Sequence, residues 1–104
     1  MKSILILGAG MSSSSLIKYL LSNAKKYDWN VQVVAQDIEL VKRKINKHER
    51  GEALAFNATN SEERKIRIAK ADLVISMLPA HYHVEVAQDC IDLKVDLITP
   101  SYIS

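Results

Sequence analysis

The residues in this sequence that point most clearly to ligand binding are two glycines near its start. Gly8 and Gly10 belong to the segment 8–13, Gly-Ala-Gly-Met-Ser-Ser, which follows an apolar run at 4–7 and precedes a helical pattern. Between a strand and a helix, Gly8 permits a tight turn, and Gly10 lets the backbone approach a pyrophosphate that the helix N-terminus attracts. Ser13 takes the place of the third small residue, which weakens the match without breaking it. The segment predicts dinucleotide binding; the alternative is a tight turn with no ligand.

A run of four serines covers residues 12–15, where the predicted helix begins. Ser12 is placed to contact a phosphate, whereas Ser14 and Ser15 are interpreted as ordinary first-turn residues, because serine commonly caps and populates helix starts. The sequence has no Gly-x-Ser-x-Gly turn, so a serine nucleophile is not supported. Ser12 is therefore the candidate ligand contact of the run.

A second feature of dinucleotide sites is an acidic residue after the second strand, roughly 20 residues beyond the glycines, which accepts hydrogen bonds from the adenosine ribose. Gln36 and Asp37 follow the apolar stretch 31–35. Asp37 suits this role, but it also stands where the N-cap of the next helix belongs, and both interpretations stay open. If Ala35 holds the acid position, Gln36 or the backbone contacts the ribose. No arginine follows at once to hold a 2′-phosphate, so the cofactor is predicted as NAD or NADP.

Other side chains that can transfer protons are His81, His83 and Tyr102. The two histidines lie at the start of a predicted helix, where polar residues satisfy free backbone amides, so a structural role is favoured. No third ligand completes a metal site around them. Cys90 lies within that helix, as expected of a small buried apolar residue. We assign no catalytic residue and no metal site.

Five short apolar runs alternate with stretches whose apolar residues have the spacing of a helix. The strands and helices that these patterns predict must position the residues named above. Strand and helix alternate four times, and each helix is long enough to cross back, which predicts right-handed βαβ units and a parallel sheet. We expect a doubly wound α/β fold of the Rossmann type, with three layers and strand order 3-2-1-4-5. The predicted strands cover residues 4–7, 31–35, 53–56, 73–77 and 95–98.

The four stretches between the strands carry apolar residues at the spacing of amphipathic helices. The third begins at Asn60 with Glu63 three residues later, the pattern of a capping box, in which Asn accepts from early amides and the carboxylate reaches back. The faces expected to be buried in the other three are Ile17, Leu20, Leu21 and Ala24; Ile38, Val41, Ile45 and His48; and Val84, Ala87 and Ile91.

Length and composition limit the class of protein. The 104 residues are 48% hydrophobic and 25% charged, as in one ordinary globular domain. The net charge is +2 and the basic residues are scattered, which leaves no basic patch for nucleic acid or an anionic membrane. No apolar run is long enough for a signal peptide or a membrane span. Cys90 is the single cysteine, which fits a reducing compartment, so we expect a cytoplasmic protein.

Two later segments are more specific than the glycine turn. Residues 72–84 read Asp-Leu-Val-Ile-Ser-Met-Leu-Pro-Ala-His-Tyr-His-Val, and residues 97–104 contain Ser-Tyr-Ile-Ser. Each resembles a segment of the saccharopine dehydrogenase (saccharopine reductase) family. The opening residues 4–11 and Asn57-Ala58-Thr59 are similar to that family too. The glycine turn is generic, but the two later segments are fairly specific in combination, and the resemblance extends over all 104 residues.

The resemblance implies that residues 1–104 are the N-terminal NAD(P)-binding domain of a longer, often dimeric oxidoreductase of lysine metabolism. Its substrate domain is absent from the sequence, which ends directly after the fifth strand, and Ser13 and Asn57 depart from the family pattern. The implied pyrophosphate contacts are Gly8, Gly10 and Met11; the ribose contacts are Gln36 and Asp37; Asn57 and Thr59 lie near the adenine; Met77, Leu78 and Pro79 line the nicotinamide side; and Ser101 and Tyr102 face the amino-acid substrate.

Two other functions remain open from the sequence. A carboxynorspermidine or homospermidine type of reductase is closely similar in this domain. A stand-alone module that senses NAD(H) and regulates a partner has the same glycine turn. The main prediction is a cofactor domain for oxidising or forming the secondary amine of saccharopine, with a small amino-acid substrate and a homodimeric complete enzyme.

Overall fold

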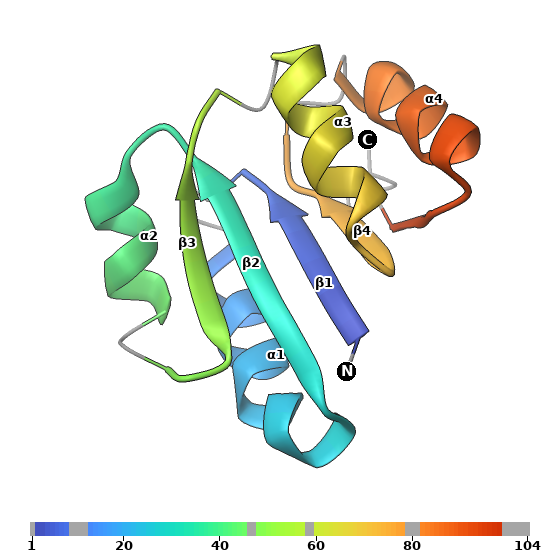
Figure 1. Ribbon diagram of the computed structural model, residues 1–104. Helices are drawn as coiled ribbons and strands as arrows, with labels where there is room; N and C mark the ends of the chain where they lie inside the picture. The colour runs from blue at the N-terminus through green and yellow to red at the C-terminus, as the bar shows by residue number, and fades with distance from the viewer. Residues whose placement is uncertain (1, 9–12, 46–47, 58–59, 79–81, 99–104) are drawn as a thin grey trace.

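The computed structural model describes residues 2–8, 13–45, 48–57, 60–78 and 82–98, and strands alternate with helices throughout them (Figure 1). The first three strands begin two residues earlier than expected, and the third and fourth end one residue earlier. The predicted alternation is therefore confirmed. The strands are β1 (Lys2–Leu7), β2 (Trp29–Ala35), β3 (Gly51–Ala55), β4 (Leu73–Ser76) and β5 (Asp96–Ile98); the helices are α1 (Ser13–Tyr27), α2 (Ile38–Ile45), α3 (Ser61–Ala69) and α4 (His83–Leu93).

The five strands form one parallel sheet of order β3-β2-β1-β4-β5, as predicted. β1 lies at its centre, and Ile6 pairs with Val33 of β2 on one side and with Ile75 of β4 on the other. Both faces of a parallel sheet are normally covered, so a central strand reads as a continuous apolar run. This explains why Ile4 to Leu7 are all buried.

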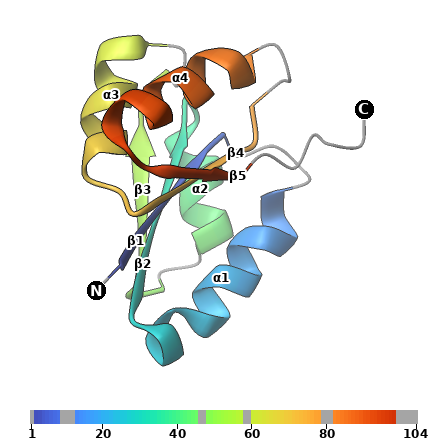
Figure 2. The ribbon, with the colours of Figure 1, turned by 90° about the vertical axis from the view of Figure 1, so that its right-hand side faces the viewer.

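Helices cover both faces of the sheet, which gives the expected three layers (Figure 2). Alternate residues of β1 point to opposite faces, as in any strand. Ile4 and Ile6 pack in a first core with α1 and α2, whereas Leu5 and Leu7 pack in a second core with α3 and α4. The crossover to the second face occurs after β3, so the strand ends near β1 are left for a ligand.

The first three helices begin near the residues expected from the sequence, and α1 and α2 bury most of the residues expected to be buried. The predicted face of α1 is buried. Asn60 caps α3, because its side chain accepts from the amides of Glu62 and Glu63. The Asn60 amide donates instead to the carbonyl of Asn57 at 2.8 Å, so it already has a partner other than the Glu63 carboxylate. His48 lies beyond the end of α2, where its Nδ1 accepts from the Arg50 amide.

The predicted face of α4 is wrong. Val84 is 77% exposed and Ile91 is 70% exposed, whereas Val86, Asp89 and Cys90 are buried. Asp89 belongs to the buried stripe because its carboxylate pairs with a guanidinium on the neighbouring helix. Ala87, the third residue of the predicted face, is half-buried. The apolar residues that pack in the second core are Val86, Cys90 and Leu93, which also have helical spacing.

That guanidinium belongs to Arg64 of α3, whose side chain is 2% exposed against 6% for Asp89. The Arg64 Nε donates to Asp89 Oδ2 at 2.5 Å. The pair thus joins the two helices of the second core within the protein interior. Buried charges need such pairing, because an isolated one loses its hydration with no compensation.

Candidate functional site

The predicted site residues that the structure describes lie just beyond the carboxyl ends of four parallel strands, at one edge of the sheet (Figure 1). Backbone hydrogen bonds hold three of these ends together. The Gly8 amide donates to the carbonyl of Val34 at 2.8 Å, and the Met77 amide donates to the carbonyl of Leu7 at 2.8 Å. Residues following β1, β2 and β4 therefore meet where open α/β sheets bind ligands.

Gly8 has a backbone conformation that demands glycine. Its φ is +96°, in the region that L-residues rarely adopt. A Cβ built on Gly8 would lie 3.3 Å from the backbone carbon and oxygen of Met77 and 3.3 Å from Leu78 Cδ2. The predicted tight turn after β1 is confirmed at this position. Gly10, Met11 and Ser12 lie outside the described residues.

Gln36 and Asp37 follow β2 directly, and both are exposed. Asp37 Oδ1 accepts from the Leu40 amide at 3.2 Å, and the Asp37 carbonyl accepts from the Val41 amide. Asp37 is therefore the N-cap of α2, as one of its two interpretations predicted. A carboxylate has several acceptor sites, so capping leaves capacity for a ribose hydroxyl. The ribose contact stays a prediction.

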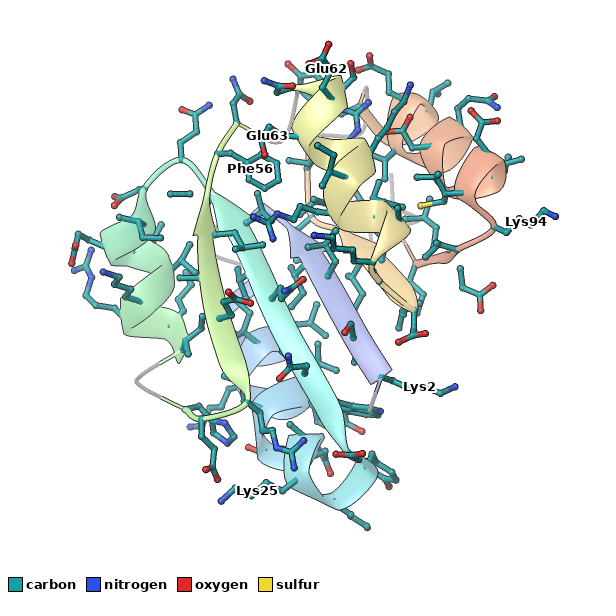
Figure 3. The ribbon with its side chains drawn as sticks, viewed as in Figure 1. Lys2, Lys25, Phe56, Glu62, Glu63 and Lys94 are labelled. Carbon is teal, nitrogen blue, oxygen red and sulfur yellow. The ribbon has the colours of Figure 1, made fainter. Side chains whose placement is uncertain are left out.

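The segment after β3 carries Phe56 and Asn57. Asn57 is exposed and its carbonyl accepts from the Asn60 amide, while Thr59 lies outside the described residues. Phe56 was expected to end the strand, but β3 ends at Ala55, so the ring belongs to this edge of the sheet, near Glu63 (Figure 3). It is half-buried against the second core, as is Leu78. The apolar pattern assigned Phe56 to the strand, and Phe56 was therefore not placed among the residues beyond the strand end.

Met77 and Leu78 continue from β4 and touch Gly8 as described above. Both are half-buried, but they face opposite sides of the sheet: Met77 packs on the first core and Leu78 on the second. The Ser76 hydroxyl just before them is buried, with no hydrogen-bond partner among the described residues. The predicted sites Pro79, Ser101 and Tyr102 lie outside the described residues, as does His81, while His83 begins α4.

Two open cavities of about 640 Å³ each lie away from this edge of the sheet. The first lies between α1 and α2, and the second extends along α2 to the amino half of β3. Arg43, Ile45 and His48 line both of them. Neither lining includes Gly8, Gln36 or Asp37, so these cavities are separate from the predicted site.

Cys90 is buried, as predicted, and its pKa is raised from 9.0 to about 11, first by burial and then by the charge of Asp89.

At pH 8 the thiolate fraction of Cys90 is then about a hundredfold below that of a free cysteine, so we expect alkylation of the native chain to be slowed at least as much. The raised pKa also means that stability falls as the pH rises from 9 towards 11, because the unfolded chain loses the proton first. The rate of alkylation by iodoacetamide measures this slowing. The same chain in urea is the control, and a native rate within tenfold of the unfolded one would contradict it.

The described residues contain no group of three or more His, Cys, Asp or Glu side chains arranged to hold a metal ion. They also contain no helix long and apolar enough to cross a membrane.

The parallel sheet of order 3-2-1-4-5 and the positive-φ glycine after its central strand define a Rossmann-type dinucleotide-binding domain. Residues 4–104 match the family described as the saccharopine dehydrogenase NADP binding domain. The chain belongs to that family. This confirms the resemblance and favours the main prediction over the two alternatives. It also confirms a nicotinamide dinucleotide as the cofactor class.

Known relatives agree with this family. The chain is 33% identical to mitochondrial alpha-aminoadipic semialdehyde synthase of Bos taurus over 99% of its own length, and 30% identical to saccharopine dehydrogenase [NADP(+), L-glutamate-forming] of Saccharomyces cerevisiae over 99%. It matches the solved apo structure of saccharopine dehydrogenase (L-Glu forming) from S. cerevisiae with a TM-score of 0.86 and 29% identity over the whole chain. The chain spans 11% of the bovine protein and 22% of each yeast chain.

Proposed function

We propose that this chain binds a nicotinamide dinucleotide across the carboxyl ends of β1, β2 and β4, as the cofactor domain of an oxidoreductase similar to saccharopine dehydrogenase. The observation that carries the proposal is the turn at Gly8. Its positive φ and the close approach of Met77 leave no room for a side chain, as a turn that brings backbone against a pyrophosphate requires. The family match supports the same assignment.

The proposed contacts extend from this turn along the edge of the sheet. The pyrophosphate lies against Gly8, Gly10, Met11 and Ser12, where the N-terminus of α1 favours negative charge. Gln36 and Asp37 hold the adenosine ribose. Asn57 and Thr59 lie near the adenine, Met77, Leu78 and Pro79 line the nicotinamide side, and Ser101 and Tyr102 face the substrate.

The cofactor, when bound, supplies or accepts a hydride, and the protein residues position it and exclude water. Met77 and Leu78 are half-buried apolar residues against Gly8, which suits them to keep water from the ring. The proposed reaction of the complete enzyme oxidises or forms the secondary amine of saccharopine in lysine metabolism, as the names of the bovine and yeast relatives suggest. The remaining parts of that enzyme would supply the groups that bind the amino-acid substrate.

The complete enzyme is proposed to act as a homodimer on a small amino-acid substrate. The cytoplasm is the proposed compartment, because a single cysteine cannot form a disulfide within the chain, which fits a reducing environment.

Gly10→Val is expected to weaken dinucleotide binding by more than about tenfold, because the motif places that backbone against the pyrophosphate and a branched side chain would displace it. Calorimetric titration of NADH and NADPH against the chain and the variant measures this. Ser22→Val, on the exposed side of α1, is the matched control and should bind like the parent. Equal binding by parent and Gly10→Val would contradict the proposed pyrophosphate contact, and a folded parent that binds neither cofactor would contradict the proposed function.

A further inference from the structure

The loops that receive the cofactor in the proposed function contain no Lys or Arg. Residues 8–17 after β1, 36–41 after β2 and 56–63 after β3 hold neither residue type, so the first basic residues beyond these strand ends are Lys18, Lys42 and Arg64. A 2′-phosphate on the adenosine ribose is normally held by an arginine near the end of the second strand. The proposed function places the dinucleotide at this edge of the sheet, where the extra phosphate finds no cationic partner in these segments.

The nearest basic side chains that follow these loops have other surroundings. Arg64 is buried and paired with Asp89, so its charge is already compensated within the second core. Lys18 lines the cavity between α1 and α2. Lys42 lines the second cavity with His48 and Gly51, which lie at the amino end of β3. Each of these cations is thus directed to a part of the domain other than the ribose position.

Acidic side chains follow the carboxyl ends of both β2 and β3. Asp37 follows β2, and Glu39 lies in the first turn of α2; both are exposed. Glu62 and Glu63 are exposed in the first turn of α3, at the same end of the sheet as Phe56 (Figure 3). A phosphate monoester carries about −1.5 to −2 charges at pH 7, so these carboxylates repel it. The same Asp37 can accept hydrogen bonds from free ribose hydroxyls.

We infer that this chain prefers NAD(H) over NADP(H), although its family is described by NADP, and that Gln36 and Asp37 determine the choice. This inference rests on the proposed function, because it assigns the ribose to the end of β2. Asp37 accepts from the 2′-hydroxyl while it caps α2, and Gln36 stands where a guanidinium would be needed for the phosphate.

The test is to titrate NADH and NADPH separately against the chain at one fixed ionic strength. NADH is expected to bind at least tenfold more tightly. In the double variant Gln36→Arg with Asp37→Ser, the ratio of the two affinities should shift towards NADPH by at least tenfold. Serine keeps the cap of α2, so the helix is retained. Circular dichroism establishes that each variant is folded.

The matched control is Gln32→Arg with Glu52→Ser. It likewise replaces a glutamine by arginine and a carboxylate residue by serine, with the same change in net charge, on β2 and β3, where Gln32 Nε2 donates to Glu52 Oε1 at 2.9 Å. The control should keep the parental ratio of affinities. If the parent binds NADPH as tightly as NADH or more tightly, the inference is overturned and the proposed function stands. If the folded parent binds neither, the proposed function fails and the inference fails with it.

Discussion

Replacing Asp89 by alanine is expected to lower the free energy of unfolding by about 3 to 5 kcal/mol, because it leaves the Arg64 guanidinium buried without its carboxylate. A domain of this size is typically stable by about 5 to 15 kcal/mol, so this loss is a large part of the total. Urea denaturation followed by circular dichroism measures the change.

Two further variants separate charge from packing. In the double variant Arg64→Met with Asp89→Leu both charges are replaced by apolar groups, and most of the lost stability should return. Glu49→Ala removes one partner of the exposed pair with Lys25 and should leave the denaturation midpoint nearly unchanged. An Asp89→Ala variant within about 1 kcal/mol of the parent would show that the buried pair contributes little.

Gly8→Ala is expected to destabilise the chain and to weaken cofactor binding. Backbone strain of a non-glycine residue at positive φ costs about 1 to 3 kcal/mol, and here the new Cβ would also press on the backbone of Met77. The turn must shift to relieve this contact, which displaces the segment proposed to hold the pyrophosphate. Denaturation gives the stability, and NADH titration at a temperature where the variant is folded gives the affinity.

Gly51→Ala is the control that distinguishes stability from binding. A Cβ at Gly51 would come within 2.6 Å of Ile45 Cγ2, so this variant should also be less stable. Gly51 begins β3, at the opposite end of that strand from the proposed site, and cofactor affinity should be unchanged in the folded chain. A Gly8→Ala variant with parental affinity would remove the turn from the proposed site.

The strands and their order were predictable because a parallel sheet buries both faces, which gives short apolar runs such as the one at 4–7. The buried face of α4 could not be chosen in this way, because two apolar sets have helical spacing: Val84, Ala87 and Ile91, and Val86, Cys90 and Leu93. Asp89 lies on the same face as the second set, and its charge argues against burial until its partner is known. That partner is Arg64, 25 residues away in the sequence, so the choice between the two faces depends on tertiary structure.

The site was partly predictable. The requirement for glycine at position 8 follows from the motif and agrees with its positive φ. The capping role of Asp37 was one of two interpretations, because an acidic residue after the second strand is typical both of a helix start and of a ribose contact. Phe56 was missed because an aromatic residue next to an apolar run extends the strand pattern by one position, whereas the strand ends at Ala55.

The central position of β1 also determines the order in which a growing chain can fold. β1 is made first, but Ile4 pairs with Val31 on one side and with Leu73 on the other, so its second neighbour emerges from the ribosome much later. Until α3 and α4 have emerged, the side of the sheet with Leu5 and Leu7 lacks the cover it has in the finished domain. This face of the domain therefore stays apolar and exposed until residue 93 has emerged, the stage at which chaperones and premature association act.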